Sequence, residues 1–269
     1  MFKLYISDTY TVDLSDWRNR MGCCKELERT IITTYRKSIW RKFIEAIEAY
    51  DLIHEGDRIA VCITGDKDSL LLAKCMQEFK LHGSINIELG FFVPTIGYNK
   101  HNCLEIMEYA KAIEIPVVMT EHVKELGCNK IALCHHFNNV IETILMGMLY
   151  NGQVGTMMPK LHNQNYEGLE VIRPLYLVRE EAILRWSERN ELRFFPCEYV
   201  FSKSFQRDED DNLYIKRADV KDLIKRLLLI NSNIDMNIFK SMYNVNLDTM
   251  ISYEKEGFTH HFLDNYESK

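Results

Sequence analysis

The feature that most constrains the fold is a series of short apolar runs that alternate with segments of helical periodicity. The first run, with its turn and helix, reads "RIAVCITGDKDSLLLAKC" over residues 58–75. Such short apolar runs are typical of strands buried on both faces, so the alternation predicts an α/β fold with a mostly parallel sheet and helices on both faces. The expected strands are 59–64, 87–93, 115–120, 130–136 and 170–173. The expected helices are 24–50, 69–81, 99–113, 138–150, 180–190 and 218–229.

Charge and polarity predict three parts: a basic helical segment over 1–54, an α/β domain over 55–200 and a C-terminal appendage over 201–269, with a polar loop at 202–212. The net charge is -6, yet eight of the ten charged residues between Trp17 and Lys42 are basic. A basic end on an acidic chain is typical of a phosphate-binding footprint, and a solvated helix face is the alternative. The basic residues are Arg18, Arg20, Lys25, Arg29, Arg36, Lys37, Arg41 and Lys42.

The cysteines and the N-terminus indicate a cytoplasmic protein. Eight cysteines are scattered along the chain without any C-x-x-C pair, which is typical of buried thiols in a reducing compartment. The first residues, "MFKLYISDTY", lack the pattern of a signal peptide. No apolar run approaches the roughly 20 residues of a membrane span, so we expect no membrane association.

One connection is unusually short for this architecture. Only nine residues, "EHVKELGCN" (121–129), separate the third and fourth expected strands. A crossover between parallel strands normally takes about 10–12 residues or more, helix included. Either the strand assignments are wrong, or a segment is missing between Thr120 and Lys124.

The turn "TGDKDS" (64–69) follows the first expected strand. In open parallel sheets ligands bind beyond the carboxyl ends of the strands, and the N–H groups of a turn and helix start form an anion site there. The turn lacks the G-x-x-x-x-G-K-[ST] pattern of a Walker loop and the G-x-G-x-x-G pattern of a dinucleotide fold.

The turn resembles the S-G-G-x-D-S loop of the PP-loop ATP pyrophosphatases. Four further stretches follow in that family's order: "LGCNKIALCHHFNNVIETILMGMLY" (126–150), "TMMPKL" (156–161), "VIRPLYLVREEAI" (171–183) and "FFPC" (194–197). Together they resemble the TtcA group, which forms 2-thiocytidine in tRNA. The resemblance implies a Rossmann-like (adenine nucleotide alpha-hydrolase-like) fold with an N-terminal helix and a C-terminal tail.

The resemblance also implies ATP with magnesium as cofactor, tRNA as partner, and an ATP-dependent tRNA sulfurtransferase activity. No catalytic residue is assigned, and Asp68 and Cys197 are the candidates. The oligomeric state stays open, with a homodimer among the options. The implied ATP-binding residues are Thr64, Gly65, Asp66, Lys67, Asp68, Ser69 and His136. The expected tRNA-binding residues are Arg29, Arg36, Lys37, Arg41 and Lys42.

The chain departs from the family pattern at positions that the resemblance implies for phosphate and cation binding. Asp66 replaces a loop glycine, whose place in the family suits either a positive φ or a close approach to phosphate. Asn138 and Asn139 replace two carboxylates, which weakens any cation site. His135 and His136 are expected on one strand with opposite directions, so they would not share a metal, and no metal site is predicted.

The family's iron–sulfur cluster is predicted to be absent. In the family a C-x-x-C followed by an arginine pair lies between the third and fourth strands, where this chain has the short 121–129 connection. Cys197 remains alone, and a cluster needs three or four protein ligands. We therefore expect residual nucleotide binding with impaired or lost catalysis. The alternatives are a working enzyme, a non-catalytic tRNA- or partner-binding paralogue, and the product of a decaying gene.

Overall fold

The computed structural model describes residues 24–95, 100–120, 123–162, 168–192, 194 and 208–268. The chain divides into two compact units. One contains the residues up to Val140 together with Met157–Ile215, and the other contains Ile141–Thr156 together with the residues from Lys216 onward. The boundaries expected from the sequence, after residues 54 and 200, stay predictions.

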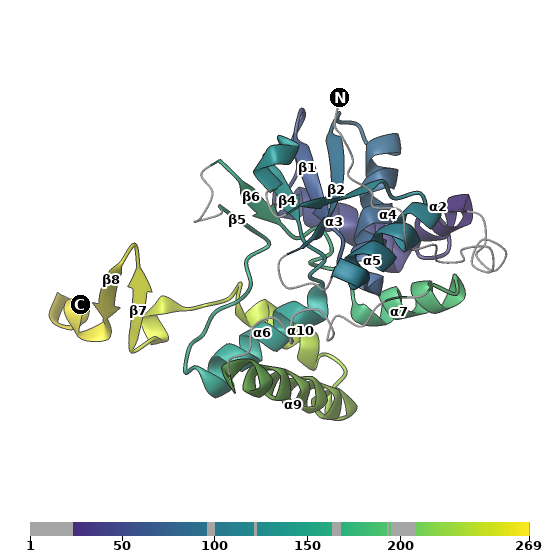
Figure 1. The fold of residues 1–269 in the computed structure, drawn as a ribbon. Helices are drawn as coiled ribbons and strands as arrows, with labels where there is room; N and C mark the ends of the chain where they lie inside the picture. The colour runs from purple at the N-terminus through teal and green to yellow at the C-terminus, as the bar shows by residue number, and fades with distance from the viewer. Residues whose placement is uncertain are drawn as a thin grey trace. The chain divides into compact units, whose positions relative to one another are not determined.

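The first unit is built on a six-stranded sheet with the strand order β3-β2-β1-β4-β6-β5. All neighbouring strands are parallel except β5 and β6, so the expected mostly parallel sheet is confirmed (Figure 1). Strand β5 had not been expected. The strands are β1 (Arg58–Cys62), β2 (Glu88–Pro94), β3 (Val117–Thr120), β4 (Lys130–Ala132), β5 (Lys160–His162) and β6 (Glu170–Ile172).

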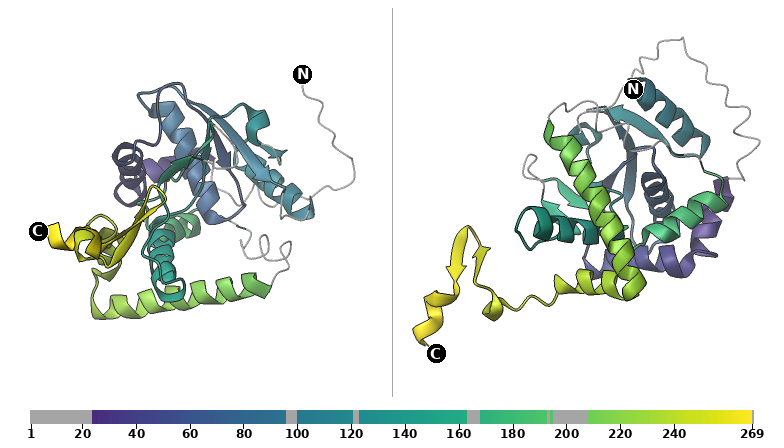
Figure 2. Two further views of the ribbon diagram at one scale, coloured as in Figure 1. Left: turned by 90° about the vertical axis from the view of Figure 1, so that its left-hand side faces the viewer. Right: turned by 90° about the horizontal axis from the view of Figure 1, so that it is seen from below.

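The α-helices of the first unit lie against the sheet (Figure 2), and their side chains form one hydrophobic core with those of the strands. Ile59, Val61 and Phe91 contribute from alternate positions of β1 and β2, and Trp186 is fully buried in the same cluster. The helices are α2 (Cys24–Ile32), π-helix η1 (Arg36–Trp40), α3 (Arg41–Ala49), α4 (Lys67–His82), α5 (Lys100–Ala112), 3-10 helix η2 (Val123–Leu126) and α7 (Glu180–Arg189).

Two long helices run from the first unit into the second: α6 (Phe137–Tyr150) and α9 (Asp208–Ile230). The second unit also contains α10 (Ile234–Ser241), η3 (Leu247–Thr249), an antiparallel hairpin of β7 (Ser252–Lys255) and β8 (Phe258–His261), and η4 (Phe262–Ser268). Because α9 begins at Asp208, the expected polar loop is wrong for residues 208–212, and the helix expected over 218–229 is longer. An acidic run suits the positive end of a helix.

The helix expected over 24–50 is interrupted. It breaks after Ile32 and resumes as the π-helix η1, with the backbone N–H of Tyr35 donating to the oxygen of Thr30. The hydroxyl of Thr33 donates to the oxygen of Arg29 at 2.6 Å, and such side-chain bonds to the local backbone compete with a regular helix. The expected apolar positions still reach the core, as the burial of Ile31, Ile39 and Phe43 shows.

In its described part, residues 123–129, the short connection between β3 and β4 contains the 3-10 turn η2 and no α-helix. The register places Thr120 beside Pro94 and Lys130 beside Ile59, which itself pairs with Leu89. The chain must therefore return about 17 Å along the strands and cross three strand spacings of about 14 Å, or about 22 Å in all. Ten residue steps separate Thr120 from Lys130. If eight of them were α-helical and two extended, the chain would span only about 19 Å, which is less than the distance required. The 3-10 turn η2 has four residues and is shorter than such a helix, so the expected strands are compatible with the short crossover.

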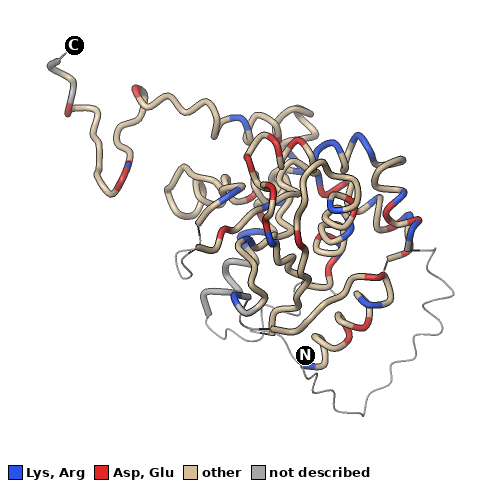
Figure 3. Tube along the Cα trace, turned by 90° about the horizontal axis from the view of Figure 1, so that it is seen from above, with Lys and Arg blue, Asp and Glu red and all other residues tan. Residues whose placement is uncertain are grey.

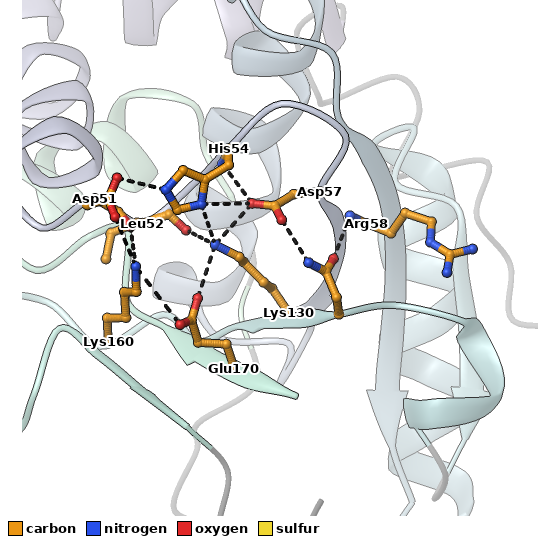
Figure 4. A network of polar contacts seen from close by, with 9 residues as sticks. Asp51, Leu52, His54, Asp57, Arg58, Lys130, Lys160 and Glu170 are labelled. Carbon is orange, nitrogen blue, oxygen red and sulfur yellow. Dashed lines mark hydrogen bonds and ion pairs between the residues drawn. The ribbon is translucent and has the colours of Figure 1, made fainter. Parts of the chain in front are cut away.

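A buried lysine ties the amino ends of the strands together (Figure 4). The ammonium of Lys130 lies 3.0 Å from a carboxylate oxygen of Asp57 and 3.0 Å from one of Glu170. It also donates to the oxygen of Leu52 at 2.7 Å and lies 3.2 Å from Nδ1 of His54. This network therefore fixes β4 and β6 against the segment that enters β1.

Candidate nucleotide-binding site

The turn at the carboxyl end of β1 combines one left-handed glycine with a capped helix. Gly65 has φ 82°, a conformation that costs a side-chain-bearing residue strain. Asp66 has φ -84° and ψ 168°, which any residue adopts. The glycine that the family pattern has at position 66 is therefore not needed for backbone conformation. Compared with glycine, Asp66 adds a carboxylate side chain at the start of α4.

Asp66 is the N-cap of α4. Its Oδ1 accepts the backbone N–H of Ser69 at 2.7 Å, and the Ser69 hydroxyl donates to the Asp66 carbonyl oxygen at 3.1 Å. The first N–H groups of a helix are the donors that bind phosphate in nucleotide sites. The carboxylate thus occupies a donor that a phosphate would otherwise use. Burial, followed by the charge of Asp68, raises the pKa of Asp66 above its ordinary value.

Lys67 is enclosed by acidic side chains. Its ammonium lies 3.0 Å from a carboxylate oxygen of Asp68 and 3.4 Å from one of Glu180, at the start of α7. Burial alone would lower the pKa of Lys67, but Asp68, with Glu180 and Asp66, holds it above its ordinary value. Nε2 of His136 lies 3.8 Å from Asp68. The structure therefore brings three carboxylates, one lysine and one histidine together at the loop.

The segment after β4 has roles that the sequence did not show. Strand β4 ends at Ala132, so His135 and His136 do not lie on a strand as expected. They still diverge, because Nε of Arg173 donates to Nδ1 of His135 at 3.3 Å, whereas His136 faces the loop. Arg173 also donates to the Met158 carbonyl oxygen, and burial lowers its pKa.

The side-chain amide oxygens of Asn138 and Asn139 accept hydrogen bonds from backbone N–H groups. Oδ1 of Asn138 accepts the N–H of Glu180 at 3.0 Å, at the start of α7, and Oδ1 of Asn139 accepts the N–H of His136 at 3.0 Å. An amide oxygen makes these bonds without charge. The substitution of carboxylates by asparagine thus keeps the local packing while it removes negative charge from this side of the site.

The described side chains do not form a ligand set for a metal or a cluster. Within the described ranges, no group of three or more His, Cys, Asp or Glu side chains is placed to hold a metal ion. Burial raises the pKa of Cys75 and of Cys103, which disfavours the thiolate that a metal requires. Cys197 lies outside the described residues. The absence of a cluster stays a prediction.

The expected tRNA-binding residues lie on the N-terminal helices, among the charged positions marked in Figure 3. Arg29, Arg36, Lys37 and Arg41 are exposed, and half-buried Lys42 pairs with Glu45 at 2.7 Å. Arg18 and Arg20 lie outside the described residues. In the PP-loop, Thr64 is half-buried and lies two residues after the end of β1.

Comparison with known proteins shows which family this chain resembles. Residues 99–209 match the model of the PP-loop domain family. A tRNA-cytidine(32) 2-sulfurtransferase of Coxiella burnetii is 27% identical over 265 residues, covering 87% of this chain and 96% of the relative. A protein of the same name, numbered 1, from Francisella tularensis is 28% identical and covers 86% of this chain and 91% of the relative. The chain is therefore similar in sequence to TtcA-like PP-loop proteins.

A solved structure agrees with this fold. The U34-tRNA thiolase NcsA from Methanococcus maripaludis, solved with its [4Fe-4S] cluster, superposes with a TM-score of 0.54 at 16% identity. The match covers 80% of the TtcA-like chain and 82% of NcsA. At this identity the likeness concerns the fold alone. No helix in the described part of the TtcA-like chain has both the length and the apolar character needed to cross a membrane.

Glu180 and Arg173 are the site residues that the sequence did not reveal, and for Asn138 and Asn139 it did not reveal the hydrogen bonds that they accept. Glu180 is one of two adjacent glutamates, and nothing in that pair indicates which one faces the loop. The contact with Lys67 arises only because α7 packs beside the start of α4. A sequence signal existed only for Asn138 and Asn139, whose positions correspond to the family's acidic pair.

Proposed function

We propose that this TtcA-like protein binds tRNA and has impaired or lost ATP-dependent thiolation of cytidine. The names of its relatives support tRNA as the partner. One observation carries the loss of activity: the carboxylate of Asp66 accepts the N–H of Ser69, at the helix start where phosphate binds in nucleotide sites. An incoming triphosphate would have to displace that carboxylate and would meet its charge.

The electrostatics of the loop support weak nucleotide binding. Lys67, the cation best placed for phosphate, is already engaged by Asp68 and Glu180. Two unit charges about 4 Å apart repel by roughly 4 kcal/mol at an effective dielectric near 20. Magnesium would offset part of this repulsion. If ATP binds, Gly65, Lys67 and the N–H of Ser69 are the groups that would contact its phosphates, and the nucleotide would supply an activated adenylyl group.

A working enzyme is the second candidate, because the loop retains Gly65, Lys67, Asp68 and Ser69 in the family's order. Its activity would also need the sulfur-transfer machinery. The described residues offer no convergent set of metal ligands, and the described residues 123–129 of the short connection contain one 3-10 turn. The proposal therefore separates tRNA binding, which we expect to persist, from thiolation, which we expect to be lost.

The test incubates purified protein anaerobically with unmodified tRNA, magnesium–ATP and a sulfide source after cluster reconstitution. The Coxiella burnetii relative serves as the positive control. We expect tRNA binding in a gel-shift assay, no 2-thiocytidine by nucleoside mass spectrometry and no stoichiometric iron. ATP-dependent formation of 2-thiocytidine would overturn the proposed loss of activity. Stoichiometric iron that disappears in Cys197→Ser would overturn the predicted absence of a cluster.

A further inference from the structure

A hollow on the N-terminal helices has the chemistry of a nucleotide site, separate from the PP-loop. It has a volume of about 250 Å³ and is lined by Arg36, Trp40, Arg41, Ile44, Glu45 and Glu48, from η1 and α3. From one end of this segment to the other, the lining changes from guanidinium groups through an aromatic and an aliphatic side chain to carboxylates.

The π-helix explains why both arginines reach this hollow. In a regular α-helix, residues five apart lie about 140° apart around the axis, so Arg36 and Arg41 would diverge. In η1 the backbone N–H of Arg41 instead bonds to the oxygen of Arg36 five residues earlier. The wider turn brings residues four and five apart onto one face, which places both arginines beside Trp40. Such π-turns occur frequently at functional sites.

The aromatic side chain of the hollow packs on the core, whereas three of its charged side chains form no ion pair among the described residues. The Trp40 ring stacks on buried Phe43, with 5.5 Å between ring centroids. Arg36, Arg41 and Glu48 form no ion pair within 4 Å among the described residues. Glu45 does pair, with Lys42 at 2.7 Å. The free polar groups are thus Arg36 and Arg41 at one end and Glu48 at the other.

We propose that this hollow binds one unpaired RNA nucleotide whose base carries an exocyclic amino group. The phosphate contacts Arg36 and Arg41, the base stacks on Trp40, and Glu48 accepts a hydrogen bond from the amino group. Unpaired RNA bases are typically recognised by stacking on aromatic rings and by hydrogen bonds to their edges, and a glutamate accepts from the cytosine amino group. The proposal deepens the proposed tRNA binding and rests on it.

The test measures binding of fluorescently labelled pentacytidylate RNA by anisotropy at fixed salt. Trp40→Leu should weaken binding by at least about fivefold, because base stacking on an aromatic ring is lost. Trp40→Phe keeps an aromatic face and should stay within about threefold of wild type. Circular dichroism checks that both variants fold. Equal affinity of Trp40→Leu and wild type would overturn the proposal.

Two further comparisons separate a built site from a basic surface. Arg36→Gln should weaken binding more than Lys37→Gln, which removes the same charge from an adjacent exposed residue outside the lining. Glu48→Gln should reduce the preference for pentacytidylate over pentauridylate. Equal losses for Arg36→Gln and Lys37→Gln, or no preference in wild type, would reduce the hollow to a general cationic surface.

Binding of tRNA by the wild type is measured in parallel. If tRNA binds but the hollow variants match wild type for pentacytidylate, the nucleotide site is refuted and the proposed function stands. If pentacytidylate binds through Trp40 but tRNA does not bind, the proposed function fails alone. Binding of free cytidine 5′-monophosphate is measured directly by isothermal titration calorimetry. Binding of this mononucleotide without binding of the pentamer would show a metabolite site and would overturn RNA as the ligand.

Discussion

At the scale of single residues, Asp66 shows how one substitution serves the fold while it opposes a ligand. An aspartate at an N-cap stabilises its helix by typically about 1 kcal/mol relative to alanine. The same carboxylate holds the Ser69 N–H at 2.7 Å and adds negative charge beside Asp68. The Asp66 carboxylate therefore competes with a bound phosphate for the same N–H group at the start of the helix.

We predict that Asp66→Gly tightens magnesium–ATP binding by about tenfold to a hundredfold, because it removes the charge and frees the N–H. Isothermal titration calorimetry on both proteins measures the change. Asp66→Asn is the matched control, since asparagine keeps the cap without the charge. A gain in both variants assigns the effect to charge, and a gain in Asp66→Gly alone assigns it to occupancy of the helix start. Unchanged or weaker binding in Asp66→Gly would refute the prediction and favour the working enzyme.

At the scale of elements, the buried Lys130 network holds the amino end of the sheet. We predict that Lys130→Met lowers the free energy of unfolding by about 3 kcal/mol or more, because it leaves the buried Asp57 carboxylate without its cation and removes the nearer of the two lysines that pair with Glu170. Lys42→Met is the control, since Lys42 pairs with Glu45 at the surface, is 44% exposed and should cost less than about 1 kcal/mol. Urea unfolding of both variants decides this, and similar losses would show that the network contributes little.

The same network predicts an acid-sensitive contribution to stability. Burial would raise the pKa of Asp57, but hydrogen bonds from Asn129, the His54 N–H and Lys130 hold it below its ordinary value of 3.8. Because the folded-state pKa is the lower one, this stabilisation is complete above 3.8 and is lost as the pH falls through the folded-state value. We predict that Asp57→Asn flattens the fall in unfolding free energy between about pH 5 and pH 2. A slope equal to that of the wild type would refute the prediction.

The elements also show what sequence could and could not predict. The expected strands and helices around the PP-loop were found because continuous apolar runs and four-residue spacing report burial directly. Helix η1 escaped prediction because Leu27, Ile31, Ile39 and Phe43 keep the same apolar spacing across the π-turn. The Lys67–Glu180 pair escaped because it joins residues more than a hundred positions apart. Such contacts depend on how helices pack and leave no local signal.

At the scale of the whole molecule, the question is whether a chain of net charge -6 can hold a polyanion. Long-range repulsion is screened over about 8 Å at physiological ionic strength, so the local density of basic groups matters more than the total. Arg29, Arg36, Lys37 and Arg41 are exposed on consecutive helical segments of one unit. A tRNA that contacts this surface would feel mainly these charges.

We predict that the affinity for tRNA falls linearly on a log–log plot against salt, with a slope of about 0.7–0.9 for each phosphate contact. The double variant Arg29→Gln/Lys37→Gln leaves the lining of the hollow intact and should reduce that slope by up to about 1.4–1.8, because two contacts release no counterions. Lys80→Gln/Lys111→Gln is the matched control, since it removes the same charge from exposed positions on α4 and α5. Equal slopes for both double variants would place the tRNA elsewhere and leave the basic run as a solvated helix face. A smaller slope only in the Arg29/Lys37 variant would show that a basic segment can bind RNA on an acidic protein.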